Sequence, residues 1–348
     1  MENIKILIWG FGAMGKGMAE MLLTKTGVEI AGICDINPDV VGKNFLKVLN
    51  IKSNHKEVII SDDIDQLLLS SKADLVLLCT DSFTAKAYPK IKKIVSSGIN
   101  VISTAEEMAY PYVNEPELSK EMDLLAKKHK VTILGTGINP GFIMDLLVIA
   151  LTGTMSNVES IEAKRVNSLS PFGKTVMEEQ GVGITLEQYE EKLSNNSLAG
   201  HVGFKESIYM IGDALGFKLD DFKQQMSPII TNIDRKSLYG EAKKGNLAGI
   251  DMRGQGYISG KEIIKMIHPQ QIEPELAGTY TGDYITIKGT PNINMAINPE
   301  ISGGIGTIAM CVNMIPHVIN AKPGLKTMID LPVPRAIMGD MRNLIEKD

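Results

Sequence analysis

The sequence predicts an α/β protein: a doubly wound parallel sheet, followed by a second α+β domain built on a mixed or antiparallel sheet. Two observations carry this prediction. Up to about residue 140, short apolar runs alternate with amphipathic helical stretches, which is the pattern of βαβ units in a parallel sheet. Beyond residue 153, strand-like runs follow one another without long helices between them, and such strands pair in a mixed or antiparallel sheet.

The elements of both parts follow in order along the chain. In the first part we expect strands at 4–10, 28–35, 73–80, 99–105 and 131–137, and helices at 13–25, 84–97 and 116–129. The right-handed crossover rule then makes the sheet doubly wound. In the second part we expect a strand at 158–166, a polar, loop-rich section to about residue 200, a helix at 203–215 and strands between 224 and 298. The apolar stretch 301–321 is predicted to form one helix that returns to the first domain.

Length and composition narrow the class of protein. A chain of 348 residues suits about two domains, and the patterns place the boundaries at 1–145, 146–302 and 303–348. The net charge of -5 gives no reason to expect nucleic acid or an anionic membrane as a partner. Three cysteines without CxxC spacing indicate reduced thiols. With no visible signal peptide or membrane-spanning run, we expect a cytoplasmic protein.

A glycine motif, GFGAMG at 10–15, directly follows the first strand and opens a helix. In this context the three glycines allow a tight turn, a close approach of pyrophosphate and close helix–strand packing. The helix N-terminus adds backbone N–H groups for the phosphates. We therefore expect a Rossmann-type domain over 1–145 that binds NAD or NADP through Gly10, Phe11, Gly12, Ala13, Met14, Gly15 and Lys16. The alternative is a glycine-rich turn without a ligand.

Further cofactor contacts are expected at the carboxyl ends of the other strands, where open α/β sheets bind ligands. Asp35 ends the second strand, where a carboxylate binds the adenosine ribose and favours NAD; Lys16 could instead reach the 2′-phosphate of NADP or simply face solvent. Asn139 lies in GTGINPGFIMD, which ends a strand and begins a helix near Pro140. The remaining candidates, which could also only make turns, are Thr80, Asp81, Ser82 and Thr104.

Two acidic residues, Glu106 and Glu107, occur in TAEEMAYP. Sugar-type oxidoreductases of similar fold carry a Glu-Lys-Pro motif with a catalytic lysine at this place, and here Glu107 replaces the lysine. This argues against alcohol oxidation and favours binding of an ammonium group. The alternative is that one of them caps the following turn or faces solvent.

The second domain supplies cations for a substrate carboxylate: Arg165, Lys174 and Arg253. An arginine fork matches a carboxylate in bidentate fashion. The alternative for each is a solvated position on the sheet or a helix.

One histidine, His201, lies between Gly200 and Gly203 just before the helix expected at 203–215. The positive end of that helix disfavours a charged imidazole, and a neutral imidazole accepts protons. His201 is therefore the candidate catalytic base, with a cap or a structural hydrogen bond as the alternative. The other four histidines, His268 among them, show no comparable setting, and we predict no metal site and no covalent nucleophile.

At these residues the chain resembles the 2,4-diaminopentanoate dehydrogenases. GFGAMGKG, STAEEMAYP, GTGINPGFIMD and GHVGFKES occur in the same order, and the likeness covers nearly the whole chain. The N-terminal half is also similar to dihydrodipicolinate reductases and diaminopimelate dehydrogenases, but the His-His pair and the Lys-x-Asp-x-Pro-Ser-Gly-Thr motif of the reductases are absent. The resemblance implies NAD(P)-dependent oxidative deamination of 2,4-diaminopentanoate at C4 to 2-amino-4-oxopentanoate and ammonia, in ornithine fermentation.

Two other functions stay open at this point. One is an NAD(P)-dependent reductase of a cyclic imine or semialdehyde, and the other is a non-catalytic regulator that senses the dinucleotide. The sheet of the second domain could pair with another copy, so we expect a homodimer that acts on a small diamino acid.

Overall fold

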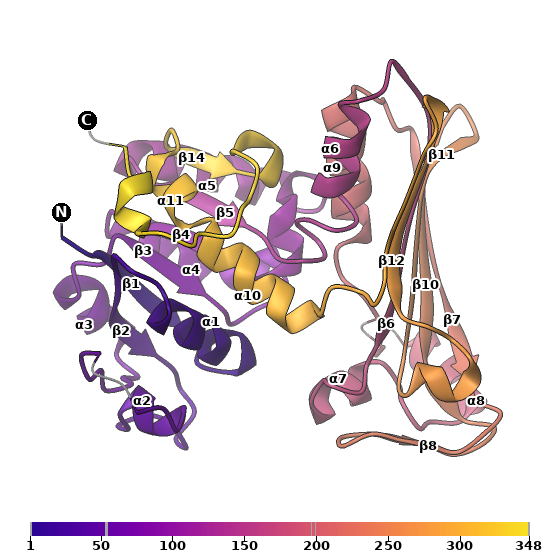
Figure 1. Ribbon diagram of the computed structural model, residues 1–348, viewed down its shortest axis with the longest axis horizontal. Helices are drawn as coiled ribbons and strands as arrows, with labels where there is room; N and C mark the ends of the chain where they lie inside the picture. The colour runs from indigo at the N-terminus through magenta and orange to yellow at the C-terminus, as the bar shows by residue number, and fades with distance from the viewer. Residues whose placement is uncertain (1, 53–54, 196, 199, 347–348) are drawn as a thin grey trace. The chain divides into compact units, whose positions relative to one another are not determined.

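The computed structural model describes residues 2–52, 55–195, 197–198 and 200–346. The chain divides into two compact units: unit 1 is Met1–Phe142 with Ser302–Asp348, and unit 2 is Ile143–Ile301. Each unit has its own six-stranded sheet (Figure 1). The chain therefore leaves unit 1 once, builds unit 2, and returns.

The sheet of unit 1 is parallel throughout, with the strand order β14-β5-β4-β3-β1-β2. Its strands are β1 (Ile4–Trp9), β2 (Val28–Cys34), β3 (Leu75–Leu78), β4 (Asn100–Ser103), β5 (Thr132–Gly135) and β14 (Gly324–Lys326). The five strands predicted in the first part are confirmed; β1 and β2 are one residue shorter than expected, and β3, β4 and β5 are three or four residues shorter. They are apolar runs because helices cover both faces, as a parallel sheet requires.

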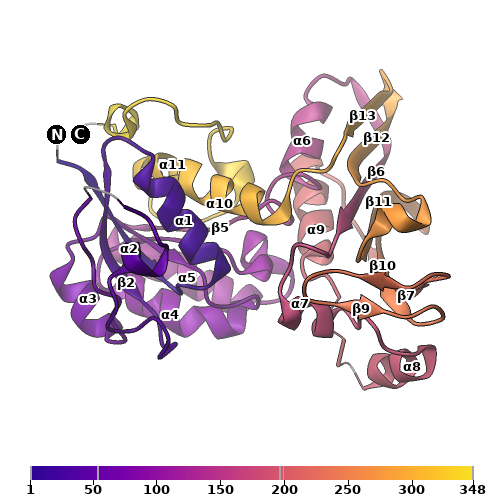
Figure 2. The same ribbon diagram turned by 60° about the horizontal axis from the view of Figure 1, so that its bottom comes forward.

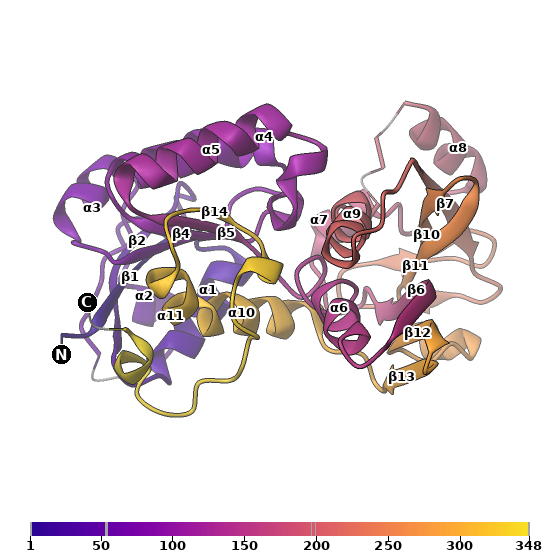
Figure 3. The ribbon, with the colours of Figure 1, turned by 90° about the horizontal axis from the view of Figure 1, so that it is seen from above.

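The helices of unit 1 lie on two sides of this sheet. They are α1 (Ala13–Leu23), α2 (Phe45–Val48), α3 (Ile64–Ser70), α4 (Thr84–Ser96), α5 (Pro116–His129), α10 (Gly303–Asn313) and α11 (Ile315–Asn320), with short 3-10 helices η1 (Glu106–Ala109), η2 (Pro111–Val113), η4 (Met328–Asp330) and η5 (Met341–Leu344). Figure 3 shows α3, α4 and α5 on one side and α1, α10 and α11 on the other. On the first side, Ile91 and Ile94 of α4 and Met122 of α5 pack on Val76 and Val101 of the sheet.

Two helix predictions near the domain boundaries are wrong. The stretch 301–321 forms two helices instead of one, because α10 ends at Asn313 and Pro316 occupies the first turn of α11. Proline has no N–H for the helix ladder and therefore begins a new helix more readily than it continues one. The helix expected near Pro140 begins only at Leu146, where the Asp145 carboxylate accepts the Leu146 N–H at 2.7 Å.

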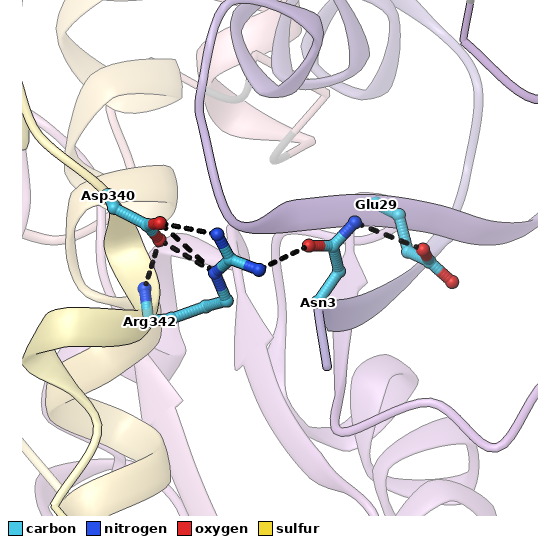
Figure 4. Close-up of polar contacts among 4 residues, drawn as sticks. All are labelled: Asn3, Glu29, Asp340 and Arg342. Carbon is cyan, nitrogen blue, oxygen red and sulfur yellow. Dashed lines mark hydrogen bonds and ion pairs between the residues drawn. The ribbon is translucent and has the colours of Figure 1, made fainter. Parts of the chain in front are cut away.

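The C-terminal segment is tied to the first strands of unit 1 by polar contacts (Figure 4). The Arg342 guanidinium donates to the Asp340 carboxylate at 2.6 Å and to the side-chain oxygen of Asn3 at 3.4 Å. Asn3 in turn donates to Glu29 of β2 at 3.3 Å. The backbone N–H of Met341 donates to the Thr26 carbonyl at 3.0 Å. These contacts join the C-terminal segment of unit 1 to its N-terminal segment and to the start of β2.

The sheet of unit 2 is mixed, as the sequence predicts, with the order β13-β12-β6-β11-β10-β7. Only the β6–β11 pair is parallel among these neighbours. The strands are β6 (Asn157–Ser168), β7 (Asp221–Ile230), β10 (Leu247–Ile258), β11 (Lys261–Gln271), β12 (Gly282–Thr290) and β13 (Ile293–Ile297), with a separate hairpin of β8 (Arg235–Lys236) and β9 (Glu241–Ala242).

Helices α6 (Leu146–Thr152) and α9 (Phe204–Leu215) cover one face of this sheet (Figure 1). Two glycines of β10 allow α9 to approach closely: a Cβ at Gly254 would lie 2.9 Å from the Phe204 ring, and one at Gly256 would lie 2.8 Å from Ile208. The section expected to be loop-rich also contains α7 (Lys174–Glu179) and α8 (Leu186–Ser194), and η3 (Pro274–Ala277) follows β11. Figure 2 shows α8 at one end of the sheet, where Tyr189 donates to the Met226 carbonyl of β7 at 2.9 Å.

Candidate active site

The glycine motif forms the turn between β1 and α1. Gly10 has φ +98°, and a Cβ there would lie 2.7 Å from the Cys79 carbonyl oxygen, while a Cβ at Gly15 would collide with the Gly10 carbonyl oxygen. A Cβ at Gly12, in contrast, would meet nothing within 4 Å. Gly12 is the N-cap of α1 and provides no side-chain cap, so this residue does not cover the first-turn N–H groups, which lack partners within the helix. The loop therefore fits a dinucleotide pyrophosphate: two glycines are required by the fold and the third leaves room for a ligand.

The other predicted cofactor contacts follow the neighbouring parallel strands, so they lie along one edge of the sheet of unit 1. Asp35 follows β2, and its carboxylate accepts the N–H groups of Phe11 and Asn37. It therefore holds the glycine loop against the end of β2. Asn139 lies in a turn after β5.

The residues after β3 and β4 make mainly local contacts. Asp81 accepts from Lys90 of α4 at 2.5 Å and from the Thr80 hydroxyl at 2.5 Å. The carbonyl of Ser82 accepts the N–H of Glu107 at 3.1 Å, and the N–H of Thr104 donates to the Leu78 carbonyl at 3.0 Å.

The two acidic residues in η1 differ in their surroundings. Both carboxylate oxygens of Glu107 accept hydrogen bonds within unit 1: from the Thr84 N–H, at the first residue of α4, at 2.7 Å and from the Asn114 amide at 3.3 Å. Glu107 thus caps α4. Glu106, beside it, is half-buried.

In unit 2, His201 lies in a turn that both flanking glycines permit. Gly200 has φ +59° and Gly203, the N-cap of α9, has φ +120°. The Gly200 carbonyl accepts from the Gln180 side chain at 2.7 Å, and the His201 N–H points at Met252 Sδ at 2.6 Å. These contacts fix the turn from two sides.

The His201 ring contacts a second histidine, His268 of β11. Their ring centroids are 4.9 Å apart with the planes at 82°, and the Phe204 ring lies 5.3 Å from His201. His268 is 3% exposed, and its Nδ1 lies 2.8 Å from the Arg165 carbonyl oxygen. Because a carbonyl oxygen only accepts, Nδ1 carries the proton and Nε2 of the neutral ring bears the lone pair.

Both imidazoles are held neutral. Burial, together with the positive charge of Arg165, lowers the pKa of His201 to about 3. Burial, His201 and Arg165 lower the pKa of His268 well below its usual value. The neutral state predicted for His201 therefore agrees with the structure, although burial rather than the helix dipole is the main cause.

The three predicted carboxylate-binding cations are not brought together. Arg165 shares the face of His268 but is 2% exposed, and its guanidinium donates to Asp283 at 2.5 Å and to the Ile301 carbonyl at 2.5 Å. Arg253 follows Met252 in β10; because successive side chains of a strand alternate, it points to the sheet face away from His201, where it pairs with Asp251. Lys174 is on the surface of α7 and pairs with Glu178 at 3.6 Å.

The expectation that His268 has no setting comparable to that of His201 is wrong, because the two rings are in contact. One signal was available: in the predicted strand EIIKMIH, His268 is in register with Ile264 and Met266, both buried, so alternation places it on the core-facing side. Nothing local could have revealed Asp283, which meets Arg165 across 118 positions of sequence. Among the described residues, no group of three His, Cys, Asp or Glu side chains is placed to hold a metal ion. No described helix is long and apolar enough to cross a membrane.

Comparisons with known proteins identify the family of this chain. The sequence profile of the 2,4-diaminopentanoate dehydrogenase C-terminal domain matches residues 142–347. The 2,4-diaminopentanoate dehydrogenase of Acetoanaerobium sticklandii is 58% identical over 349 residues, which cover 100% of this chain and 99% of that relative.

Solved structures share the fold. The amine dehydrogenase of Mycobacterium smegmatis has a TM-score of 0.87 at 25% identity, covering 97% of this chain and 98% of that one. The structure of GenD2 from gentamicin A biosynthesis, in complex with NAD, has a TM-score of 0.54 at 13% identity and covers 95% and 90%. The fold is thus that of Rossmann-type dehydrogenases. With a matching profile over more than half its length and a full-length relative, the chain belongs to the 2,4-diaminopentanoate dehydrogenase family.

Proposed function

We propose that the protein catalyses the NAD(P)-dependent oxidative deamination of 2,4-diaminopentanoate at C4, giving 2-amino-4-oxopentanoate and ammonia, in ornithine fermentation. The observation that carries this proposal is the 58% identity to the Acetoanaerobium sticklandii enzyme over the whole chain. The open space over Gly12 supports it, because it provides a place for the cofactor pyrophosphate.

The chemistry divides between the cofactor and the chain. NAD(P), when bound by the glycine loop, would supply the acceptor for the hydride that leaves C4 of the neutral amine. The chain has three tasks: to hold the dinucleotide by the glycine loop, to orient the amine, and to move the protons when water adds to the resulting iminium and ammonia leaves. We assign orientation of an amino group to the acidic pair Glu106 and Glu107. Both oxygens of Glu107 also accept hydrogen bonds within unit 1, from Thr84 and Asn114.

We assign the proton transfer from the attacking water to His201. An imidazole with a pKa near 3 is a poor base by itself. A substrate carboxylate close to the ring would raise that pKa, because a negative neighbour favours the protonated form and offsets the charge of Arg165. Arg165 does not contact the substrate in this proposal, because its guanidinium pairs with Asp283. Its backbone carbonyl fixes the tautomer of His268, and the His268 ring packs on His201.

The activity is tested by incubating the purified protein with NAD or NADP and 2,4-diaminopentanoate, with reduced nicotinamide followed by absorbance and ammonia measured. We expect reduced nicotinamide and ammonia in equal amounts. In the reverse direction, we expect oxidation of the reduced cofactor with 2-amino-4-oxopentanoate only when ammonia is present. Turnover only of cyclic imines or semialdehydes would replace the proposal by a reductase. Cofactor binding without turnover of any amino acid would replace it by a sensor.

The role of His201 is tested by His201→Asn. Loss of a general base typically lowers kcat by about 10²–10⁴-fold, and we expect this loss with unchanged NAD affinity. The variant His129→Asn, at a half-buried position at the end of α5 in unit 1, is the matched control and should keep wild-type turnover. Unchanged kcat in His201→Asn would make His201 structural.

We further propose that the enzyme is a cytoplasmic homodimer. The sheet face that carries Arg253 is opposite α9 and bears half-buried polar side chains, including Gln255 and Lys265, which suits pairing with a second copy. Three free cysteines support a reducing compartment. Light scattering in solution tests the assembly: a mass of one chain would refute it.

A further inference from the structure

Unit 1 contains a cavity of about 660 Å³ that the glycine motif does not account for. It lies between the first turn of α1 and the segment around α2. Its polar lining consists of three lysines, two carboxylates and one amide: Lys16, Lys43, Lys47, Asp39, Glu57 and Asn44. The lining is therefore net positive.

Backbone hydrogen bonds connect the cavity to the end of β2. The Ile60 N–H donates to the Lys43 carbonyl at 3.0 Å, and the Gly42 N–H donates to the Ile60 carbonyl at 2.8 Å. The next residue, Ser61, pairs with β2: its N–H donates to the Ile33 carbonyl and its carbonyl accepts the Asp35 N–H, both at 3.0 Å. The lysine-bearing wall is thus anchored beside Asp35, where the adenosine ribose binds in this fold.

The charges at this edge suit an additional phosphate. In the part of the chain that the structure describes, none of Lys16, Lys43 and Lys47 has a carboxylate within 4.0 Å. The Asp35 carboxylate, which would repel a phosphate, already accepts two backbone N–H groups, and these donors offset part of its charge. A lysine ammonium is a compact cation with three donors, which suits a phosphate.

We propose that this cavity receives the adenosine 2′-phosphate of NADP, with Lys43 and Lys47 on one wall and Lys16 on the other. The lysines of the 43–47 segment then select the phosphorylated cofactor, since the residues that directly follow Asp35 are uncharged Ile36, Asn37 and Pro38. The proposal rests on the proposed function only in taking NAD(P) as the cofactor.

The test measures binding of cofactor fragments to the full-length protein by calorimetry, without substrate. We expect 2′,5′-ADP to bind about tenfold more tightly than 5′-AMP, the usual size of one or two partly exposed charge pairs. In the double variant Lys43→Gln/Lys47→Gln this ratio should fall to about one, while the affinity for 5′-AMP stays the same. The matched control Lys120→Gln/Lys128→Gln changes two exposed lysines of α5 and should keep the wild-type ratio.

A ratio near one in the wild-type protein, or a ratio that survives in the double variant, overturns the proposal. Inorganic phosphate alone separates a general anion site from a 2′-phosphate site. If phosphate without 5′-AMP competes strongly against 2′,5′-ADP, the cavity is a general anion site and the 2′-phosphate assignment is refuted. Fragment binding does not depend on turnover. A wild-type protein that prefers 2′,5′-ADP but does not oxidise 2,4-diaminopentanoate would therefore refute the proposed function and leave the cavity assignment standing.

Discussion

At the scale of single residues, burial decides which charged side chains of unit 2 can meet a ligand. Arg165 is a good carboxylate binder by chemistry, but it is 2% exposed and its guanidinium is paired with Asp283. A buried arginine without such a partner would cost several kcal/mol, so the pair is a requirement of the fold. The same charge also disfavours protonation of the two histidines beside it.

The histidine pair predicts a pH dependence of stability. The pKa of His201 in the folded protein is about 3 and that of His268 is also lowered, whereas both return to about 6.5 on unfolding. Below about pH 6.5 the unfolded chain therefore binds more protons than the folded protein. The free energy of unfolding then decreases as the pH is lowered. His201 should contribute a loss of about 1–2 kcal/mol between pH 6.5 and pH 5, and His268 should add a loss in the same direction.

Urea unfolding of the wild type and of His201→Asn/His268→Asn at these two pH values measures this contribution. The carboxylates titrate equally in the wild type and in the double variant. The difference between the two proteins in the loss of unfolding free energy from pH 6.5 to pH 5 therefore isolates the contribution of the histidines. We expect a smaller loss in the double variant and the wild-type loss in His129→Asn. Equal losses in all three would show that the pair is charged in the folded state.

At the scale of elements, the glycines of the β1–α1 turn have two different roles: two are required by the fold, and one leaves room for a ligand. Gly10 and Gly15 are required by backbone approach, since a Cβ at either position would overlap a carbonyl oxygen. Gly12 has φ -77° and open space around its Cα. Any L-residue can adopt that φ value, so nothing in the protein itself demands glycine there.

Gly12→Ala should therefore keep its stability and lose cofactor affinity. The added methyl group would occupy the space of the pyrophosphate, and such overpacking costs about 1–3 kcal/mol, or roughly tenfold to a hundredfold in Kd. Thermal unfolding and NAD titration measure the two effects separately. In the contrasting variant Gly15→Ala, we expect both stability and binding to fall. Wild-type NAD affinity in Gly12→Ala would mean that the dinucleotide does not pass over this turn.

At the scale of the whole molecule, the two units have separate cores, and the chain enters unit 1 twice. The returning segment adds β14 to the edge of the parallel sheet, where Gly324 to Lys326 pair with β5. Units with separate cores can unfold separately. The cofactor-binding turn belongs entirely to unit 1.

We expect NAD to stabilise unit 1 selectively. At 100 times its Kd, a ligand adds about 2.7 kcal/mol to the unfolding free energy of the part that binds it. Hydrogen exchange in β1 and β2 should slow about 100-fold at that concentration if these amides exchange through unfolding of unit 1, while exchange in β12 and β13 stays unchanged. Equal slowing in both sheets would show that the units unfold together.

Much of the fold could be predicted because its signals are local. The apolar runs of β1 to β5, the glycine spacing at 10–15 and the strand-like segments after 224 each reflect only neighbours in sequence. Short elements such as α2 and β14 have no such period, and they form because the rest of the unit supplies partners. Pro316 is a local signal for a break between two helices, but the stretch 301–321 is apolar throughout, and this pattern by itself predicts one continuous helix.

The sequence by itself determined the parallel sheet and the dinucleotide turn, whereas the neutral state of His201 comes mainly from burial in the folded protein. Only the tertiary structure decided which side chains meet. His201 contacts His268 and Arg165 pairs with Asp283 because β6, β11 and β12 are neighbours in the sheet of unit 2. Likewise, Lys16 shares a cavity with Lys43 and Lys47 because the 58–61 segment joins their wall to β2. Hydrophobic periodicity acts between near neighbours, whereas burial and pairing of charges depend on contacts across many positions of sequence.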